Sequence, residues 1–302
     1  MQVPSISMTR DGPRLSRIAF GCWRLADWKL DRREAAALIE ASLGLGITTF
    51  DHADIYGDYR CETLFGEALA EAPALKNRLQ IVTKCGIKLV SPARPAHGLK
   101  HYDTSRAHIL ASVDGSLRAL GVDQIHVLLI HRPDALMDPD EVAAAFTHLR
   151  DAGKVRCFGV SNFSPSQCAL LASRLPFGLV TNQVELSPLA LAALDDGTLD
   201  HCLRERISPM AWSPFAGGRL FTDEGVQAVR VREALAAIGK DTGASLDQVA
   251  LAWILTHPAN IVPVIGTGKL ARVEAAAAAA DLRLSREQWY AVWRASQGRD
   301  AP

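Results

Sequence analysis

Eight short apolar runs alternate with amphipathic stretches along this chain of 302 residues. Such an alternation predicts strands joined by crossover helices, repeated as βα units. The repeat closes into a (β/α)₈ barrel or opens into a long doubly wound sheet. The predicted strands are IAFG (18–21), ITTF (47–50), LQIVTK (79–84), QIHVLLI (124–130), VRCFGVS (155–161), LVTNQVE (179–185), ISPMAWS (207–213) and IVPVIG (261–266).

The segments between these runs carry helix start and stop signals. Asp31 and Ser164 stand where N-caps belong, and Gly46, Gly121 and Gly153 stand where helices end. Helices are therefore predicted over 31–46, 62–72, 105–121, 139–154 and 194–206, with the alanine patch 275–280 inside another helix.

Residues at the ends of the runs favour the barrel. A doubly wound sheet binds its ligand at one switch point, usually beside a GxGxxG turn that this chain lacks after its first run. A parallel barrel instead gathers the C-terminal ends of all its strands on one rim. Polar or aromatic residues follow nearly every run here, namely Trp23, Asp51, Lys84, His131, Ser161, Asn162, Gln183, Trp212, Ser213 and Thr267.

We therefore predict an α/β fold consisting of a (β/α)₈ TIM barrel, as a single domain over residues 1–302. Asp11-Gly12 lies between two alternating runs and predicts a β-hairpin ahead of the barrel. Two longer connections, 85–104 and 213–226, are expected to be rim loops that shape a binding pocket.

Composition narrows the class of ligand. Lys plus Arg and Asp plus Glu number 33 each, which gives no electrostatic case for nucleic acid or a membrane surface. The six cysteines are widely spaced and lack zinc-ligand spacing, so reduced thiols and no metal are expected.

The chain shows no secretory signal and no apolar stretch that could span a bilayer, which favours a cytoplasmic location. We expect a small-molecule substrate and a monomer or weak homo-oligomer.

Four of the strand-end residues form a chemically coherent set: Asp51, Tyr56, Lys84 and His131. A tyrosine is a poor acid at neutral pH unless a cation lies beside it, and Lys84 can be that cation. Asp51 would keep the lysine charged, and His131 would donate a hydrogen bond to a substrate oxygen. This set suits reduction of a carbonyl, and a nicotinamide or flavin cofactor must then supply the hydride.

Seven ordered motifs make the reaction class more specific. They resemble the aldo-keto reductase superfamily, particularly its bacterial members, over Gly21 to Arg272. The resemblance implies reduction of an aldehyde or ketone to an alcohol with NADPH, with Asp51, Tyr56, Lys84 and His131 as the catalytic tetrad and Tyr56 as the general acid. The motifs are FDHADIYG, VTKCG, LLIHRP, FGVSNF, NQVELSP, AWSPFAGGRL and VIGTG.

The resemblance also implies where NADPH is held. Ser161, Asn162 and Gln183 would contact the nicotinamide carboxamide, and Trp212 would stack on its ring. The turn GTGK, with Lys269 and Arg272, would meet the 2′-phosphate. The complete implied cofactor set is Gly21, Cys22, Trp23, Asp51, Ser161, Asn162, Gln183, Trp212, Ser213, Pro214, Phe215, Gly217, Leu220, Gly266, Thr267, Gly268, Lys269 and Arg272; the implied substrate set is Trp23, Tyr56 and His131.

Several positions depart from the family pattern. His52 stands where the family often has Thr, Trp212 where it often has Tyr, and Gly266 where many members carry a lysine; Ala275 and Ala276 replace polar adenine contacts. Trp23, Trp212 and the 85–104 connection indicate an apolar or aromatic substrate pocket.

Other interpretations stay open. The chain can be a cofactor-binding redox-sensing or regulatory subunit with slow turnover, as the β subunits of potassium channels are understood to be. It can also be a non-redox lyase or isomerase in which Lys84 forms a Schiff base.

Tyr56 and Tyr59 could both be ordinary half-buried aromatics, and the DxxxxYG spacing favours Tyr56 as the acid. His126, inside an apolar run, is interpreted as structural.

Overall fold

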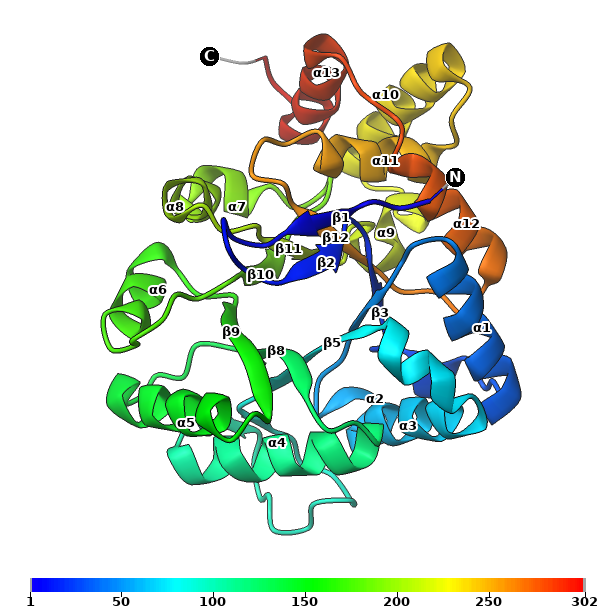
Figure 1. The fold of residues 1–302 in the computed structure, drawn as a ribbon. Coiled ribbons are helices and arrows are strands. Elements are labelled where there is room, and N and C mark those ends of the chain that lie inside the picture. The colour runs from blue at the N-terminus through cyan, green and yellow to red at the C-terminus, as the bar shows by residue number, and fades with distance from the viewer. Residues whose placement is uncertain (1, 301–302) are drawn as a thin grey trace.

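The predicted barrel is present. In the computed structural model, which describes residues 2–300, the eight main strands are all parallel and each pairs with the next one along the chain. Pairing of the last strand with the first closes the ring, as Figure 1 shows. The barrel strands are β3 (Ala19–Gly21), β4 (Thr49–Asp51), β5 (Gln80–Cys85), β8 (Ile125–Ile130), β9 (Val155–Ser161), β10 (Asn182–Glu185), β11 (Met210–Trp212) and β12 (Val262–Ile265).

Helices surround the strands and cover their outer faces (Figure 1). Each crossover between successive strands contains at least one of them, as a parallel sheet requires. The α-helices are α1 (Arg32–Gly44), α2 (Tyr56–Tyr59), α3 (Cys61–Glu71), α4 (Arg106–Leu120), α5 (Pro139–Asp151), α6 (Pro165–Ala172), α7 (Ala192–Asp195), α8 (Thr198–Glu205), α9 (Arg219–Thr222), α10 (Val226–Thr242), α11 (Leu246–Leu255), α12 (Leu270–Ala279) and α13 (Arg286–Gln297), and the 3₁₀ helices are η1 (Leu25–Asp27), η2 (Pro73–Arg78) and η3 (Ala216–Gly218).

The helix caps follow the sequence signals, with one correction. Asp31 and Ser164 each form a capping box at the start of their helix, and Gly121 ends α4 with a φ of 63°. The prediction of one helix over 194–206 is wrong. Gly197 has a φ of 81°, a conformation that costs glycine little, and the chain turns there between α7 and α8.

Most of the strands are shorter than the apolar runs that predicted them, although β5 and β9 are as long as theirs. Residues 179–181 and 207–209 precede β10 and β11, although the sequence predicted them as strand. β4 is also shorter than its run but ends one residue later, because Asp51 is the last residue of the strand and pairs with Val82 of β5. The carboxylate of Asp51 is therefore anchored on the sheet itself.

The predicted N-terminal hairpin plugs one end of the barrel. Strand β1 (Ser5–Ser7) pairs antiparallel with β2 (Arg14–Ser16), and the connection that contains Asp11-Gly12 is closed by Met8 N donating to Pro13 O over 2.9 Å. Met8 and Leu15 are fully buried in the cluster that fills the barrel interior. Because the hairpin occupies the N-terminal end of the strands, the C-terminal rim remains for a ligand.

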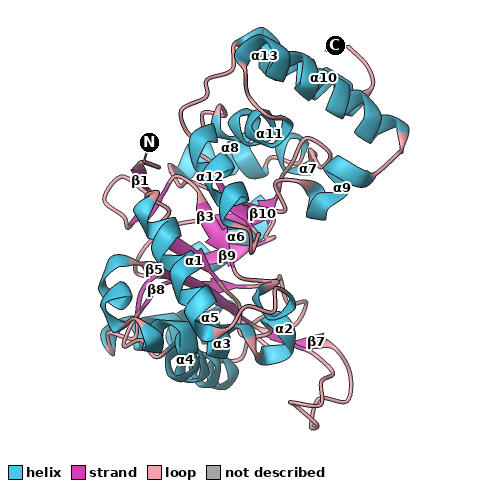
Figure 2. Ribbon diagram, turned by 90° about the vertical axis from the view of Figure 1, so that its right-hand side faces the viewer, coloured by secondary structure: helices cyan, strands magenta, loops and turns pink. Residues whose placement is uncertain are grey.

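The two long connections lie on that rim. The 85–104 segment contains a small hairpin of β6 (Ile87–Lys88) and β7 (His101–Tyr102), and the second connection contains η3 and α9. In Figure 2 the β7 segment, α2 and α9 all lie on the right-hand side of the barrel. The predicted long rim loops are thus confirmed.

Three observations concern the chain as a whole. All six cysteines are free, and five of them are buried. Within residues 2–300, no helix combines the length and the apolar character that crossing a bilayer demands. The same residues contain no group of three or more His, Cys, Asp or Glu side chains placed to hold a metal ion.

Candidate active site

The ammonium of Lys84 is held at the rim by two side chains and one backbone carbonyl. Its Nζ lies 2.8 and 2.7 Å from the two carboxylate oxygens of Asp51, 2.8 Å from the carbonyl oxygen of His52 and 3.1 Å from the hydroxyl of Tyr56. Asp51 pairs with Val82, so Lys84, two residues further on, projects from the same face of the sheet. An ammonium has three hydrogens, and all three have acceptors here.

Burial and charge oppose one another at Lys84, which is only 1% exposed. Burial lowers the pKa of a lysine, but the Asp51 carboxylate and Tyr56 outweigh it, and the pKa of Lys84 lies above its ordinary value. The lysine is therefore a fixed cation at neutral pH. This charge state fits the role of a cation beside a proton donor and does not suit a Schiff-base nucleophile, which must be neutral.

Tyr56 follows β4 on a tight turn of unusual backbone conformation. Gly57, Asp58 and Tyr59 have φ values of 58°, 59° and 64°, in the left-handed region. Two of these residues are not glycine, so the turn stores conformational strain next to the candidate acid. Burial raises the pKa of the Tyr56 phenol, and the neighbouring Lys84 acts in the opposite direction. The phenol stays protonated and can act as an acid.

His131 faces Tyr56 from the end of β8. The two ring centroids lie 5.7 Å apart at an angle of 78°. Burial, with the positive charges of Lys84, Arg132 and Lys100, holds the pKa of His131 well below its ordinary value, so the imidazole is neutral. Its Nδ1 is buried and has no hydrogen-bond partner among residues 2–300. An unpaired acceptor is less costly than an unpaired N–H, so the tautomer with hydrogen on Nε2 is favoured.

The residues expected at the nicotinamide form one network with the tetrad. Ser161 Oγ donates to the backbone oxygen of Gln183 over 2.7 Å, and Gln183 Nε2 donates to Asp51 over 2.8 Å. Asn162 Nδ2 donates to Ser161 Oγ over 2.8 Å, and Trp212 Nε1 donates to Asn162 Oδ1 over 2.9 Å. Sequence reasoning placed these residues on one rim, but it did not foresee that the Gln183 amide is committed to Asp51.

The other expected cofactor residues lie on the same rim but vary in exposure. Gly21 ends β3 and Cys22 follows it, both of them buried, whereas Trp23 is 55% exposed. In the β11 connection, Ser213 and Phe215 are half-buried, and Pro214 and Leu220 are buried. Leu220 is 0% exposed as a whole residue, so neither its side chain nor its backbone presents open surface to a ligand here. The roles of these residues stay predictions.

One pair of glycines offers open backbone, and one helix start lacks a side-chain cap. Gly217 and Gly218 have φ values of 69° and 102°, and no atom lies within 4 Å of where a Cβ would stand. Gly266, Thr267 and Gly268 lead into α12, whose N-cap residue Lys269 makes no side-chain cap hydrogen bond.

Behind the tetrad lies a buried polar layer that sequence reasoning missed. His52 is 0% exposed, neither of its ring nitrogens has a partner among residues 2–300, and its ring packs against Phe65 with centroids 4.5 Å apart. Burial, then Lys84, lower the pKa of His52 to about 3. Asp54 bonds to Ser112 of α4, and burial raises its pKa to about 7.

Two further residues near the site carry signals that the sequence shows only weakly. The hydroxyl of Tyr59 accepts from Leu89 N over 2.9 Å, and its ring lies 4.6 Å from the Arg94 guanidinium carbon. Tyr59 therefore ties the 85–104 connection to the turn that carries Tyr56. The second of these residues is Arg132, which directly follows His131 and lies over the ring of Trp212. His126 has the structural role that was predicted, because its Nδ1 accepts from Ile81 N over 3.1 Å.

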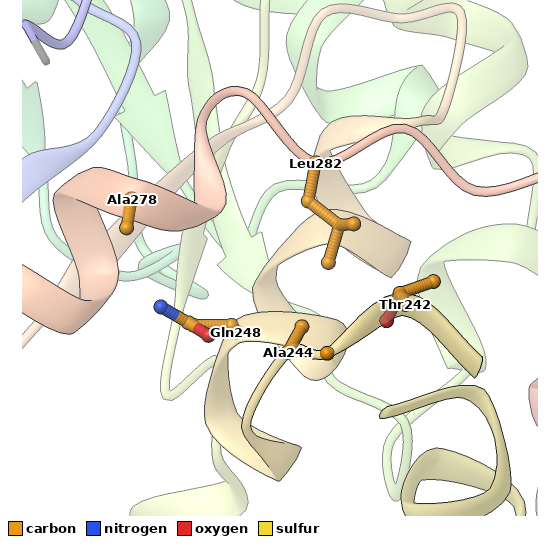
Figure 3. A pocket seen from close by; sticks show the side chains of 6 residues that line it. Thr242, Ala244, Gln248, Ala278 and Leu282 are labelled. Carbon is orange, nitrogen blue, oxygen red and sulfur yellow. The ribbon is translucent and has the colours of Figure 1, made fainter. Parts of the chain in front are cut away.

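A hollow elsewhere on the described surface is not part of this site. It has a volume of about 220 Å³ and is lined by Thr242, Gly243, Ala244, Gln248, Ala278 and Leu282, between α11 and the ends of α10 and α12 (Figure 3). None of the tetrad residues lines it, so the site is assigned from the convergence of side chains at the rim.

Comparisons with known proteins agree with the geometry. The sequence model described as "Aldo/keto reductase family" matches residues 17–296. The uncharacterized oxidoreductase YcsN of Bacillus subtilis is 53% identical over 290 residues, 96% of this chain and 97% of that protein. A 6-dehydroglucose reductase of Agrobacterium fabrum is 45% identical over 294 residues, 96% of this chain and 97% of that protein.

A solved structure shares the fold. The crystal structure of the thermostable aldo-keto reductase Tm1743 with the inhibitor epalrestat aligns with a TM-score of 0.82 at 24% identity, over 97% of this chain and 99% of that chain. The resemblance seen in the sequence motifs is thereby confirmed by independent comparisons. This chain belongs to the aldo/keto reductase family.

Proposed function

We propose that this protein is an enzyme that reduces an aldehyde or ketone to the corresponding alcohol, with NADPH as hydride donor and Tyr56 as proton donor. One observation carries the proposal: the hydroxyl of Tyr56 accepts a hydrogen bond from Lys84, which the Asp51 carboxylate keeps charged. Membership of the aldo/keto reductase family and relatives named as oxidoreductase and reductase support it.

Each tetrad residue then has one task. His131 donates from Nε2 to the carbonyl oxygen and orients it. Tyr56 gives its proton to the same oxygen as negative charge develops there. The Lys84 ammonium stabilises the phenolate that remains, because a cation within about 4 Å favours the charged form of an acid. Asp51 fixes Lys84 in position and maintains its charge.

The chain has features that fit NADPH. A reduced nicotinamide, when bound, supplies the hydride that no side chain can supply. Trp212 is half-buried at the rim, where its ring can stack on the nicotinamide, and the open backbone of Gly217 and Gly218 suits a pyrophosphate. The first N–H groups of α12, which no side chain caps, suit a phosphate as well.

Two cations favour NADPH over NADH. Lys269 and Arg272 are exposed at the start of α12, and neither forms an ion pair within residues 2–300. A 2′-phosphate at this helix start would meet both their charges and the uncapped N–H groups. Many members of the family carry a lysine where this chain has Gly266. Lys269 and Arg272 would therefore supply the positive charge that binds the 2′-phosphate.

The test combines cofactor consumption with one conservative variant. Wild-type protein is mixed with NADPH and a panel of aldehydes and ketones while NADPH absorbance is followed. Tyr56→Phe should keep NADPH binding and lose about 10²- to 10⁴-fold in kcat, because only the proton donor is removed. Tyr290→Phe, on the exposed part of α13, is the matched control.

Two outcomes would contradict the proposal. Unchanged turnover in Tyr56→Phe would remove Tyr56 from the mechanism. Tight NADPH binding by wild-type protein with no turnover of any carbonyl compound would favour the redox-sensing or regulatory alternative.

A further inference from the structure

Arg132 is a half-buried cation on the rim that has neither an acidic nor a hydrogen-bonding side-chain partner among residues 2–300. It directly follows His131, and its guanidinium carbon lies 5.6 Å from the ring centroid of Trp212. Within residues 2–300 it forms no ion pair and no side-chain hydrogen bond. A guanidinium carries five N–H donors and a permanent charge, and the face of a tryptophan satisfies none of those donors. The guanidinium is therefore able to bind an acceptor that residues 2–300 do not provide.

The charges around Arg132 do not neutralise it. Lys100, on the 85–104 connection, is close enough to act with Arg132 on the imidazole of His131, where both lower the pKa. The Asp51 carboxylate is already shared between Lys84 and Gln183. Two acids of the described rim form no ion pair with Arg132: Glu185, which ends β10, and Asp134, which accepts from Thr104 and from Leu136 N.

We propose that Arg132 is a specificity-determining residue that binds a carboxylate of the substrate, so that the preferred substrates are carbonyl compounds carrying a carboxylate a few bonds from the reacting carbonyl. The inference rests on the proposed function, because it takes the carbonyl oxygen to lie between Tyr56 and His131. It adds a charged contact to the apolar or aromatic substrate pocket that Trp23 and Trp212 indicated in the sequence.

The geometry explains why an anion is preferred to a hydroxyl. A carboxylate can accept two parallel N–H bonds from one guanidinium, which a single hydroxyl cannot do. Lys100 adds a second positive charge that attracts an anion and has little effect on a neutral group. Because the Arg132 guanidinium is near enough to lower the pKa of the His131 imidazole, a short spacer is expected between the bound carboxylate and the carbonyl carbon.

The experiment compares matched substrates. Wild-type protein, Arg132→Gln and Arg132→Lys are assayed with NADPH on 4-oxobutanoate and 5-oxopentanoate, on butanal and pentanal, and on D-glyceraldehyde. Wild type should prefer the oxo acids to the alkanals of equal length. Arg132→Gln should lose about ten- to a hundredfold in kcat/KM for the oxo acids, mainly through KM, while the alkanals change by less than about twofold. Arg132→Lys should recover part of the loss.

Arg156→Gln is the control, since Arg156 is an exposed arginine near the start of β9, at the opposite end of the barrel. Arg156→Gln should leave the ratio of kcat/KM between the oxo acids and the alkanals unchanged. Binding is also measured without turnover, by calorimetric titration of the NADP⁺ complex with 4-hydroxybutanoate, the product of 4-oxobutanoate reduction. Wild type should bind it, and Arg132→Gln should bind it at least about tenfold more weakly.

The outcomes separate the two proposals. If wild type reduces alkanals but Arg132→Gln lowers both substrate classes equally, the inference is overturned and the proposed function stands. A weaker NADPH affinity in Arg132→Gln, with unchanged oxo-acid preference, would assign Arg132 to the cofactor instead. Preference for D-glyceraldehyde over the oxo acids would overturn the carboxylate assignment. If no carbonyl compound is reduced, the proposed function fails, and the titration alone decides whether Arg132 binds a carboxylate.

Discussion

The side-chain nitrogen of Gln183 lies 2.8 Å from Oδ1 of Asp51, although 132 positions separate the two residues in the chain. Gln183 belongs to β10 and Asp51 to β4, which are not neighbours in the barrel. The hydrogen bond therefore crosses the barrel mouth. It joins the residues expected at the nicotinamide to the residues expected to move the proton.

Removing this bond should weaken the fold as well as the site. Gln183→Leu should lower the free energy of unfolding by about 1–3 kcal/mol, because a buried carboxylate oxygen loses a donor. Gln183→Glu should cost more at neutral pH, because it places a second carboxyl group against Asp51, and part of that loss should return at acidic pH. Urea denaturation at neutral and acidic pH measures the free energy of unfolding of both variants. Equal stabilities for the two variants at neutral pH would contradict the prediction.

Breaking the buried ion pair should be far more costly than breaking an exposed one. Lys84→Met should lower the free energy of unfolding by about 3–5 kcal/mol, because it leaves Asp51 charged and buried. Lys154→Met is the control, since the Lys154–Asp114 pair is equally short at 2.6 Å but about 40% exposed, and it should cost at most about 1 kcal/mol. The double variant Lys84→Met with Asp51→Leu should recover part of the loss. Similar values for the two single variants would refute this account.

His52 should make the protein sensitive to acid. Burial lowers its pKa from 6.5 in the unfolded chain to about 3 in the folded one, so the unfolded state binds more protons between these values. Stability is lost as pH falls from about 6.5 to about 3, by at most about 5 kcal/mol. His52→Leu should be more stable at neutral pH, since it removes two unpaired nitrogens, and its stability should fall less over that range. Denaturation at a series of pH values tests this, and parallel curves for the two proteins would exclude His52 as the cause.

Tyr59 should hold the 85–104 connection in place. Tyr59→Phe removes the acceptor of Leu89 N and should expose the connection to trypsin after Lys88 or Lys100, with a loss of about 1 kcal/mol of stability. Tyr102→Phe changes a tyrosine in the same connection whose hydroxyl makes no hydrogen bond within residues 2–300, and should leave cleavage unchanged. The rate and position of cleavage are read by mass spectrometry. Cleavage at the wild-type rate in Tyr59→Phe would show that other contacts fix the connection.

The barrel and its tetrad were predictable because their signals are local. Strand runs, caps such as Asp31 and the spacing of Asp51 and Tyr56 lie within a few residues of one another. Closure of a parallel barrel then brings every strand end to one rim, so Lys84 and His131 reach the same place without further information. The helix over 194–206 was wrongly predicted because Gly197 breaks the pattern through its backbone conformation, which composition alone does not reveal.

By itself, the sequence determined which residues stand at the rim and which chemical groups they bring. Only the tertiary structure decided which of those groups are already committed to one another and which remain free: Gln183 to Asp51, Tyr59 to Leu89, and Arg132 to no acid in the part of the chain that the structure describes. The physical reason is that a hydrogen bond or a desolvation cost depends on distance and burial across strands far apart in the chain, whereas periodicity and spacing record only the neighbours along it.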